Sequence, residues 1–550
     1  MRLTSVEIEG FRAITRLRIE LRDVTVLIGE HNSGKSTVLD ALEACLGFHN
    51  TDPVMDVRAE DFCRDQSRTD PAPRMAVTLE FEETDRSEWN DGPFLRYADR
   101  GDSAGLRRVR FRAEARLNES GQIDRRVRIF DADAASPEDV MHAWAALRAS
   151  MPVLHLRSNR YVNADAVDST HPPQDASDDR VLSETFLDMC RAHGRVSSHE
   201  LQEAIDRAES MLENIPADLI RAPSNGRRSL DTIDRPRSAL SRLAGGIREY
   251  RPGTGAQAAG VFLLMSMILD ARGPRALAPG TMPIVLIEEP EAHLHPIVAS
   301  MSWGLLEGLR AQVVATSYSS EIVASTPLQS LRRLIRKGDA IEVREVSEKT
   351  LEPEELRRVS YHVRVKRGGS LFARCWVLIE GETEGWLLPE LANLCGYSLP
   401  AEGVECIEFA QCGIEPLVKT ADAMGIAWHL LADGDSSGRG YASTVREMLH
   451  GRSHRKHLTA LRPRDIEHFL FLSGYAHVYR NGAGLTGKSG EKPERAGSVI
   501  RRAIKSSSKP QMALRVIEAM AHAGPDGVPP VLRTLIETVV AMARAESDGV

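Results

Sequence analysis

Four segments at the start of the chain show three kinds of hydrophobic pattern. Residues 5–11 (SVEIEGF) and 16–21 (RLRIEL) alternate apolar and polar positions, as strands do when one face is buried. Residues 24–29 (VTVLIG) form a continuous apolar run, which is typical of a central buried strand. Residues 38–46 (VLDALEACL) have the spacing of an amphipathic helix. The pattern therefore predicts two antiparallel strands, a central strand and a helix.

Further strands are predicted on both sides of a polar insertion. They are the alternating or apolar runs 75–83, 107–117, 125–130, 151–156, 282–289 and 312–317, with a helix from about residue 137. Residues 166–234 begin rich in His, Asp, Ser and Pro and continue with charged, helical patterning. We expect a helical insertion there. A surface excursion without a role of its own and a dimerisation element are equally good interpretations.

A second pattern begins after a basic, irregular linker at 357–369. Apolar strands and amphipathic helices then alternate, at 375–380, 381–394, 404–410, 414–424 and 426–433. Alternation of this kind predicts a parallel sheet covered by helices. The tail from about residue 498 has helical patterning. The fold class is therefore α/β, with a helical C-terminal region.

Composition adds limits rather than a function. A chain of 550 residues exceeds one ordinary core, so two to four domains are expected. No apolar run approaches the ~20 residues of a membrane span, and the N-terminus lacks a secretory pattern, so we expect a cytoplasmic protein without a membrane partner. The seven cysteines contain no CxxC pair, which argues against a zinc site or a disulfide framework.

Net charge is −8, yet basic runs occur at 107–112, 125–128, 332–337 and 452–457. Phosphate binding depends on such local runs rather than on the total charge. Each run alone is more often a solvated face.

Residues 29–37 (GEHNSGKST) match the phosphate-binding pattern GxxxxGK[ST]. The pattern follows an apolar strand and precedes a helix, which favours function over a chance match. Its glycines let backbone N–H groups surround phosphates, and the helix N-terminus adds a positive dipole end. Lys35 is expected to reach the β- and γ-phosphates and Ser36 to hold Mg²⁺. The expected ATP-binding residues here are Gly29, Asn32, Gly34, Lys35, Ser36 and Thr37.

A second apolar strand ends in two carboxylates, Glu288 and Glu289. Glu288 is suited to the magnesium water shell of a bound nucleotide, and Glu289 to polarising the attacking water as a general base. An ordinary strand followed by an acidic loop is the alternative. It is less favoured because the loop continues as EAHLHP.

These two segments together resemble the ABC ATPases of the SMC, Rad50, RecF and OLD group. The resemblance implies that two heads sandwich ATP, so a homodimer is expected, through the heads or the insertion. It places Glu291 and His293 in the loop after the second strand. Tyr318 stands where the group has its switch histidine, and the best signature segment, residues 253–257 (GTGAQ), matches only faintly. ATP binding is therefore expected, with slow turnover.

A second acidic constellation follows in the alternating region. Glu380 and Glu384 lie at a strand-to-helix junction, and Asp433 and Asp435 end a later apolar strand. Strand ends of a parallel sheet converge on one crevice, so the pairs can meet. Four carboxylates there would repel one another unless cations neutralise them. Two Mg²⁺ or Mn²⁺ ions roughly 3.5–4 Å apart would do so and would clamp a phosphodiester. Solvated acidic groups are the alternative.

The order EGxxE then DxD resembles a Toprim domain. Joined to the ATPase pattern, it resembles the OLD (overcoming lysogenization defect) family of ATP-dependent endonucleases, nearest its YbjD-like branch, over nearly the whole chain. The resemblance implies that Asp465 and Glu467 complete the metal shell. It also implies that Lys509 stabilises charge on the phosphate, with Lys505 as the less favoured candidate. A surface lysine is the alternative for Lys509.

The expected domains are an ABC ATPase in two parts (1–165 and 235–365) around the insertion (166–234), a Toprim nuclease domain (366–480) and a helical C-terminal region (481–550). We expect a metal-dependent DNA endonuclease that its ATPase head regulates, in DNA repair or phage defence. Glu289, Lys509, Glu380 and Asp433 are its expected catalytic residues. A RecF-like, ATP-driven DNA clamp is the alternative. The DNA form, the trigger and any further protein partner stay open.

Overall fold

The computed structural model divides the chain into two compact units, unit 1 (residues 1–343) and unit 2 (residues 344–550). The residues that it describes are 1–47, 52–63, 73–86, 88–90, 94–100, 105–130, 136–151, 153–156, 283–292, 311–365, 368–485 and 495–547. The predicted insertion, the signature candidate at 253–257 and His293 lie outside these ranges. The domain limits given above stay predictions.

Unit 1 contains an antiparallel sheet in the order β2-β1-β4-β6-β5, with β7 paired to β6. Its strands are β1 (Arg2–Phe11), β2 (Ile14–Glu20), β4 (Arg74–Glu82), β5 (Asp99–Arg100), β6 (Arg107–Leu117) and β7 (Ile123–Ile129). Side chains along β6 alternate between buried and half-buried, because one face of the sheet packs on the core. The predicted antiparallel strands at the start of the chain are confirmed.

A second sheet of unit 1 runs in the order β12-β11-β3-β10-β9-β8. Its strands are β3 (Val24–Gly29), β8 (Val153–Leu156), β9 (Ile284–Glu288), β10 (Gln312–Thr316), β11 (Leu331–Lys337) and β12 (Ala340–Arg344). The five strands from β11 to β8 are parallel. Strand β3 lies between β10 and β11, as its continuous apolar run predicts.

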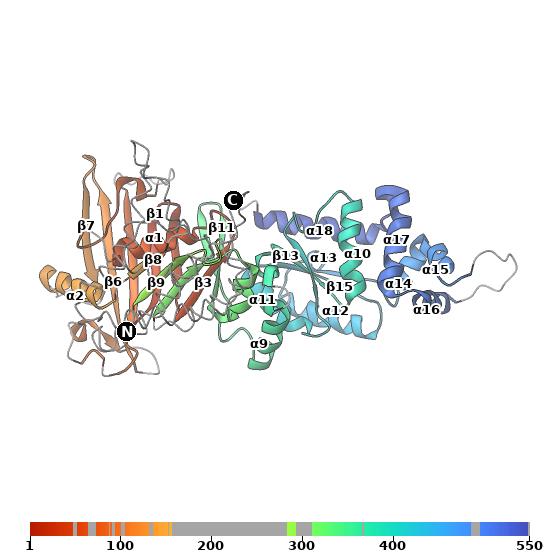
Figure 1. Ribbon diagram of the computed structural model, residues 1–550, viewed down its shortest axis with the longest axis horizontal. Helices are drawn as coiled ribbons and strands as arrows, with labels where there is room; N and C mark the ends of the chain where they lie inside the picture. Colours follow the sequence, from red (N-terminus) through yellow and green to blue (C-terminus); the bar gives the residue numbers. More distant parts are fainter. Residues whose placement is uncertain are drawn as a thin grey trace, which may run out of the picture. The chain divides into compact units, whose positions relative to one another are not determined.

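Helix α1 (Lys35–Leu46) shares one hydrophobic core with strands of both sheets. Figure 1 shows it among β1, β8 and β9. Among the described residues, the other α-helices of unit 1 are α2 (Pro137–Ser150) and α8 (Ser320–Ser325). Ser136 and Ser319 accept hydrogen bonds from the first N–H groups of α2 and α8, which explains where these helices begin.

Unit 2 is built on a parallel sheet in the order β14-β13-β15-β16. Its strands are β13 (Cys375–Ile379), β14 (Val404–Glu408), β15 (Ala427–Ala432) and β16 (Leu458–Ala460). Helices α10 and α18 lie on one side of this sheet and α12 on the other (Figure 1). The helices of unit 2 are α9 (Pro353–Val359), α10 (Glu382–Leu394), α11 (Ile414–Met424), α12 (Ser436–Met448), α13 (His454–His457), α14 (Ile466–Leu470), α15 (Ala476–Gly482), α16 (Ala496–Ser506), α17 (Lys509–Ala523) and α18 (Pro530–Ser547).

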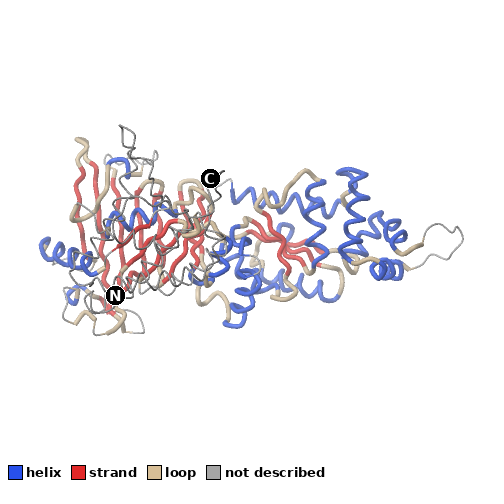
Figure 2. The backbone as a smooth tube through the Cα atoms, in the orientation of Figure 1, coloured by secondary structure: helices blue, strands red, loops and turns tan. Residues whose placement is uncertain are grey.

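The segment predicted as an irregular linker is largely helical. Helix α9 continues as a π-helix at Ser360–Val365, and a 3₁₀ helix follows at Gly368–Phe372. Glu352 and Glu355 form a capping box that starts α9, a signal that the basic composition of the segment obscured. Figure 2 shows the strands of unit 2 surrounded by helices. Strands β13, β14 and β15 confirm the three predicted strands, whereas the short β16 was not predicted. Among the described residues, no helix is both long and apolar enough to cross a bilayer.

Candidate functional site

Backbone geometry explains the glycines of the nucleotide-site loop. Gly34 has φ +89°, and a Cβ there would lie 2.7 Å from Ile341 Cδ1. A Cβ on Gly29 would lie 2.3 Å from the carbonyl oxygen of Leu334 on β11. Asn32 also has a positive φ, 61°, which Asn tolerates better than most residues. The loop therefore requires small or permissive residues where GxxxxGK[ST] has them.

Lys35 begins α1 and folds back over the loop. Its Nζ donates to Gly29 O at 2.9 Å, to Glu30 O at 2.7 Å and to Ser33 Oγ at 3.2 Å. Burial lowers the pKa of Lys35 to about 8, although Glu289 and Glu30 act in the opposite direction. A bound phosphate would oppose the effect of burial, because it places negative charge beside the ammonium.

The carboxylates predicted to serve the magnesium of ATP (Glu288) and the attacking water (Glu289) lie at the carboxyl end of β9. Glu288 is its last residue and is 9% exposed. Glu289 has φ +44°, and its N–H donates to Thr316 O at 3.0 Å at the end of the adjacent β10. Strands β3, β10 and β9 are consecutive and parallel, so their carboxyl ends share one edge of the sheet. Ser36 is exposed at that edge, and Thr37 is half-buried.

Glu291, in the loop after β9, accepts hydrogen bonds from the loop after β10. Glu291 Oε1 accepts from Ser317 Oγ at 2.9 Å and from the backbone N–H groups of Tyr318 at 2.7 Å and Ser319 at 3.2 Å. Burial nevertheless raises the pKa of Glu291. The Tyr318 ring stacks on His31, with centroids 4.4 Å apart. The residue at the expected switch-histidine position therefore contacts the nucleotide-site loop.

In unit 2, four of the predicted carboxylates follow two adjacent parallel strands. Glu380 comes directly after β13 and Glu384 lies in the first turn of α10, where it is 6% exposed. Asp433 comes directly after β15, and Asp435 caps α12 by accepting from Gly438 N at 2.8 Å. Strands β13 and β15 pair directly, so both acidic segments begin at the same edge.

Gly434 holds this edge close to a third loop. Its N–H donates to Pro463 O at 3.1 Å. A Cβ at this position would lie only 2.2 Å from Pro463 O, 2.6 Å from Arg462 O and 2.7 Å from Leu461 O. The glycine of DGD is therefore required for a close backbone approach. That approach brings the loop before α14, which carries the third pair of carboxylates, beside the first two pairs.

Asp465 and Glu467 of α14 face this centre together with Lys509, the first residue of α17. Lys509 Nζ lies 3.2 Å from Glu467 Oε1. Burial acts to lower the pKa of Lys509, but the negative charges of Glu467 and its carboxylate neighbours outweigh burial and raise this pKa. Asp465 accepts a hydrogen bond from His468 N at 2.8 Å. Burial acts to raise the pKa of Asp465, but its contacts with His468 lower this pKa.

The carboxylates of this centre raise one another's pKa. Burial raises the pKa of Asp433 to about 8, and the charges of Glu384 and Glu380 add to the rise. Burial also raises the pKa of Glu384 to about 7 and, together with the charge of Asp435, raises that of Glu380. Glu380 Oε2 is buried and receives no hydrogen bond from the described residues. Neighbouring carboxylates that repel one another, one of them with a buried oxygen that receives no hydrogen bond from the described residues, fit the ligand set of Mg²⁺ or Mn²⁺.

Individual arginines in three of the basic runs form hydrogen bonds or ion pairs within the fold. Arg332 in β11 is 2% exposed and donates to backbone carbonyls. Arg112 and Arg126 on β6 and β7 both pair with Glu114. Sequence reasoning could not foresee these partners, because they come from neighbouring strands. It also missed His155, whose neighbours belong to other elements.

Both parts of the chain are similar to known protein families. Residues 1–370 match the family model described as "Protein of unknown function (DUF2813)". Residues 371–435 match the model described as "Overcoming lysogenization defect protein-like, TOPRIM domain". The uncharacterized protein YbjD of Escherichia coli (strain K12) is 34% identical over 574 aligned residues that cover both chains completely.

Two solved structures illustrate the similarity of each part. An SMC head domain from Thermotoga maritima matches 63% of this chain and 100% of its own, with 14% identity and a TM-score of 0.32. The C-terminal region of the Burkholderia pseudomallei OLD protein matches 31% of this chain and 99% of its own, with 15% identity and a TM-score of 0.27.

Proposed function

Because this chain belongs to the DUF2813 family and carries an OLD-like Toprim domain, we propose that it is a metal-dependent DNA endonuclease regulated by its ABC-type ATPase head. One observation carries the proposal. Two pairs of carboxylates follow the adjacent parallel strands β13 and β15, Gly434 joins this edge to the loop that precedes the third pair, and Lys509 Nζ lies 3.2 Å from Glu467 Oε1 of that pair.

The metal-binding residues in this proposal are Glu380, Glu384, Asp433, Asp435, Asp465 and Glu467. Bound Mg²⁺ or Mn²⁺ supplies Lewis acidity and an activated water for phosphodiester hydrolysis. The protein's own part is to hold carboxylate oxygens in place and to release protons from Asp433 and Glu384, whose pKa values are raised. Lys509 places an ammonium where negative charge increases on the phosphate, which lowers the barrier to cleavage.

Helix α16 provides a basic surface next to this centre. A Cβ on Gly497 would lie 3.3 Å from His468 Nε2, so the start of α16 touches α14. Arg501, Arg502 and Lys505 are exposed along α16. Exposed basic side chains beside a hydrolytic centre suit a nucleic-acid backbone, whose phosphates dominate non-specific binding. This surface supports DNA as the substrate.

The nucleotide pocket supplies regulation in this proposal. Lys35 and Ser36 bind ATP and its Mg²⁺, Glu288 orients the magnesium water shell, and Glu289 polarises the attacking water. The ring of Tyr318 at the switch position supports slow turnover, because phenol is a weaker base than imidazole at neutral pH. We also propose a homodimer, as in the two-headed ATPases that the chain resembles, acting in the cytoplasm in DNA repair or phage defence.

A cleavage assay with three proteins tests the proposal. Wild type, Asp433→Asn and Lys35→Ala would each be incubated with supercoiled and linear DNA, with Mg²⁺ or Mn²⁺, with and without ATP. Wild type is expected to nick or degrade DNA with metal. Asp433→Asn is expected to lose cleavage and keep ATP affinity, whereas Lys35→Ala loses ATP affinity. If wild type cleaves under no condition, the ATP-driven clamp is the correct function.

A further inference from the structure

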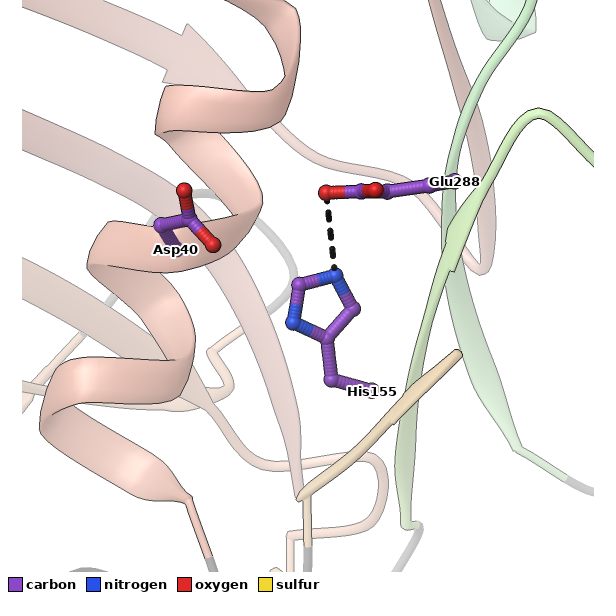
Figure 3. A group of neighbouring side chains, drawn as sticks. All are labelled: Asp40, His155 and Glu288. Atoms are coloured by element: carbon purple, nitrogen blue, oxygen red, sulfur yellow. Dashed lines mark ion pairs between the residues drawn. The ribbon is translucent and has the colours of Figure 1, made fainter. Parts of the chain in front are cut away.

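Unit 1 contains a buried histidine between two carboxylates from separate elements. Asp40 comes from α1, His155 from β8 and Glu288 from β9, and they are 8%, 7% and 9% exposed. Figure 3 shows the three side chains pointing toward one another, with Asp40 on the helix and Glu288 on the strand side of the imidazole. One ligand atom of each lies within 4.8 Å of the others.

The spacing of these atoms suits a shared ion. His155 Nε2 lies 3.5 Å from Glu288 Oε1. Two ligands ~2.1 Å from one ion at a tetrahedral angle stand ~3.4 Å apart. The separation of this one pair is therefore what two ligands of one ion need, and it is long for a direct hydrogen bond. The Asp40 oxygen lies within 4.8 Å of both atoms.

A fourth residue orients the imidazole from behind. Glu43 Oε2 lies 2.8 Å from His155 Nδ1, so the carboxylate receives the Nδ1 proton. That contact leaves the Nε2 lone pair facing Glu288. Histidines that bind metals usually donate their second ring N–H to a carboxylate or carbonyl in this way. This hydrogen bond points to a metal ligand independently of the spacing of the cluster.

Charge at the cluster also favours a cation. Asp40 and Glu288 are buried beside one imidazole, Glu43 is 34% exposed, and Arg12 pairs with Asp40. Buried carboxylates are costly unless a nearby positive charge offsets them. Imidazole with carboxylates suits zinc, manganese, iron or cobalt better than magnesium, which prefers oxygen ligands alone.

We propose that Asp40, His155 and Glu288 bind one divalent transition-metal ion, with Glu43 as a positioning residue. Three protein atoms leave room in the coordination shell for water. Glu288 is also the carboxylate proposed to serve the magnesium of bound ATP. An ion at this site therefore couples metal occupancy to the nucleotide pocket. The binding itself does not depend on the proposed nuclease activity.

Equilibrium dialysis with Zn²⁺ tests the site without nucleotide or DNA. The full chain would carry Glu384→Gln and Asp433→Asn, so that the Toprim centre no longer binds metal strongly. This background is expected to bind one equivalent of zinc. His155→Gln is expected to weaken binding by at least ~10-fold, and Glu43→Gln by ~10–100-fold. His142→Gln, at an exposed histidine on α2, is the matched control and leaves affinity unchanged.

Thermal melting checks that each variant folds. Should His155→Gln fail to fold, Asp40→Asn and Glu43→Gln decide the question, because each removes charge while keeping its size. The proposal is overturned if the background retains no zinc, or if these substitutions leave zinc affinity unchanged. In that case the imidazole only links the carboxylates of α1 and β9. Cleavage of DNA has no part in this measurement, so failure of one proposal is distinguishable from failure of the other.

Discussion

The ammonium of Lys35 lies 4.1 Å from the centre of the Tyr318 ring. The cation expected to bind ATP phosphates therefore interacts with an aromatic face on the loop after β10. The same ring stacks on His31 of the nucleotide-site loop. Without a nucleotide, these contacts stabilise a position of Lys35 in which its Nζ also binds the carbonyl groups of its own loop.

Replacement of Tyr318 by leucine should strengthen ATP binding. A cation–π contact contributes ~0.5–2 kcal/mol, and this one stabilises the nucleotide-free position of Lys35. Its loss corresponds to a decrease of roughly 2- to 30-fold in the dissociation constant. Titration with a fluorescent ATP analogue measures the effect, with Tyr361→Leu, an exposed tyrosine in unit 2, as control. Unchanged or weaker affinity in Tyr318→Leu would contradict the prediction.

Binding of Mn²⁺ to unit 2 should release protons near neutral pH. In the metal-free fold, Asp433 and Glu384 have pKa values of about 8 and about 7, so they hold protons that a cation must displace. Affinity for Mn²⁺ therefore falls as pH decreases below about 8. Calorimetry in two buffers of different ionisation enthalpy measures the release, which should be smaller in Asp433→Asn. An equal heat in both buffers at pH 7 would refute the proton displacement.

Without metal, the same raised pKa values make stability depend on pH in a defined direction. The unfolded state releases these protons near the ordinary carboxyl pKa, whereas the fold keeps them up to about pH 7 for Glu384 and about pH 8 for Asp433. The fold therefore loses stability as pH rises from the ordinary carboxyl pKa to about 7 for Glu384 and about 8 for Asp433. Mn²⁺ should restore it, which thermal melting of the metal-free and metal-bound protein measures.

Lys509 and Lys505 should differ in their effect on cleavage. Both side chains are exposed, but Lys509 Nζ lies 3.2 Å from Glu467 Oε1 at the acidic centre, whereas Lys505 lies on α16. Loss of a group that stabilises transition-state charge costs ~10²–10³ in kcat. Lys509→Gln should show a loss of that size in the DNA cleavage assay, and Lys505→Gln little change. An equal or larger loss in Lys505→Gln would reverse the assignment.

Two glycines of the same loop and helix should respond in opposite directions to alanine. A Cβ at Gly434 meets three carbonyl oxygens within 2.7 Å, whereas one at Gly440 in α12 meets nothing within 4 Å. Gly434→Ala should destabilise by ~1–3 kcal/mol and weaken metal binding. Gly440→Ala should stabilise by ~0.5–1 kcal/mol. Urea unfolding measures both changes. If Gly434→Ala leaves the free energy of unfolding unchanged, the loop at residues 461–463 can move to accept the methyl group, and the prediction is wrong.

The short-range features of both sites could be predicted from the sequence. The predicted motif from Gly29 to Thr37 runs from the end of β3 through a loop into the first turn of α1, and the carboxylates of Glu380 and Asp433 follow strands that were visible as apolar runs. These predictions succeed because hydrophobic periodicity, loop glycines and strand ends depend on neighbours along the chain. The roles of these residues in catalysis stay predictions.

Long-range contacts decided what the sequence could not. The arginines of β6 and β7 looked available for phosphate, yet Glu114 pairs with two of them, because adjacent strands place opposite charges side by side. His155 had no motif around it. Its chemistry arises only where β8 packs beside β9 and α1, which brings Glu43, Asp40 and Glu288 to one imidazole. The sequence by itself showed that two sets of strands end in carboxylates. Which side chains come into contact at those strand ends was decided only by the tertiary structure, because burial and pairing depend on segments that are distant in the chain.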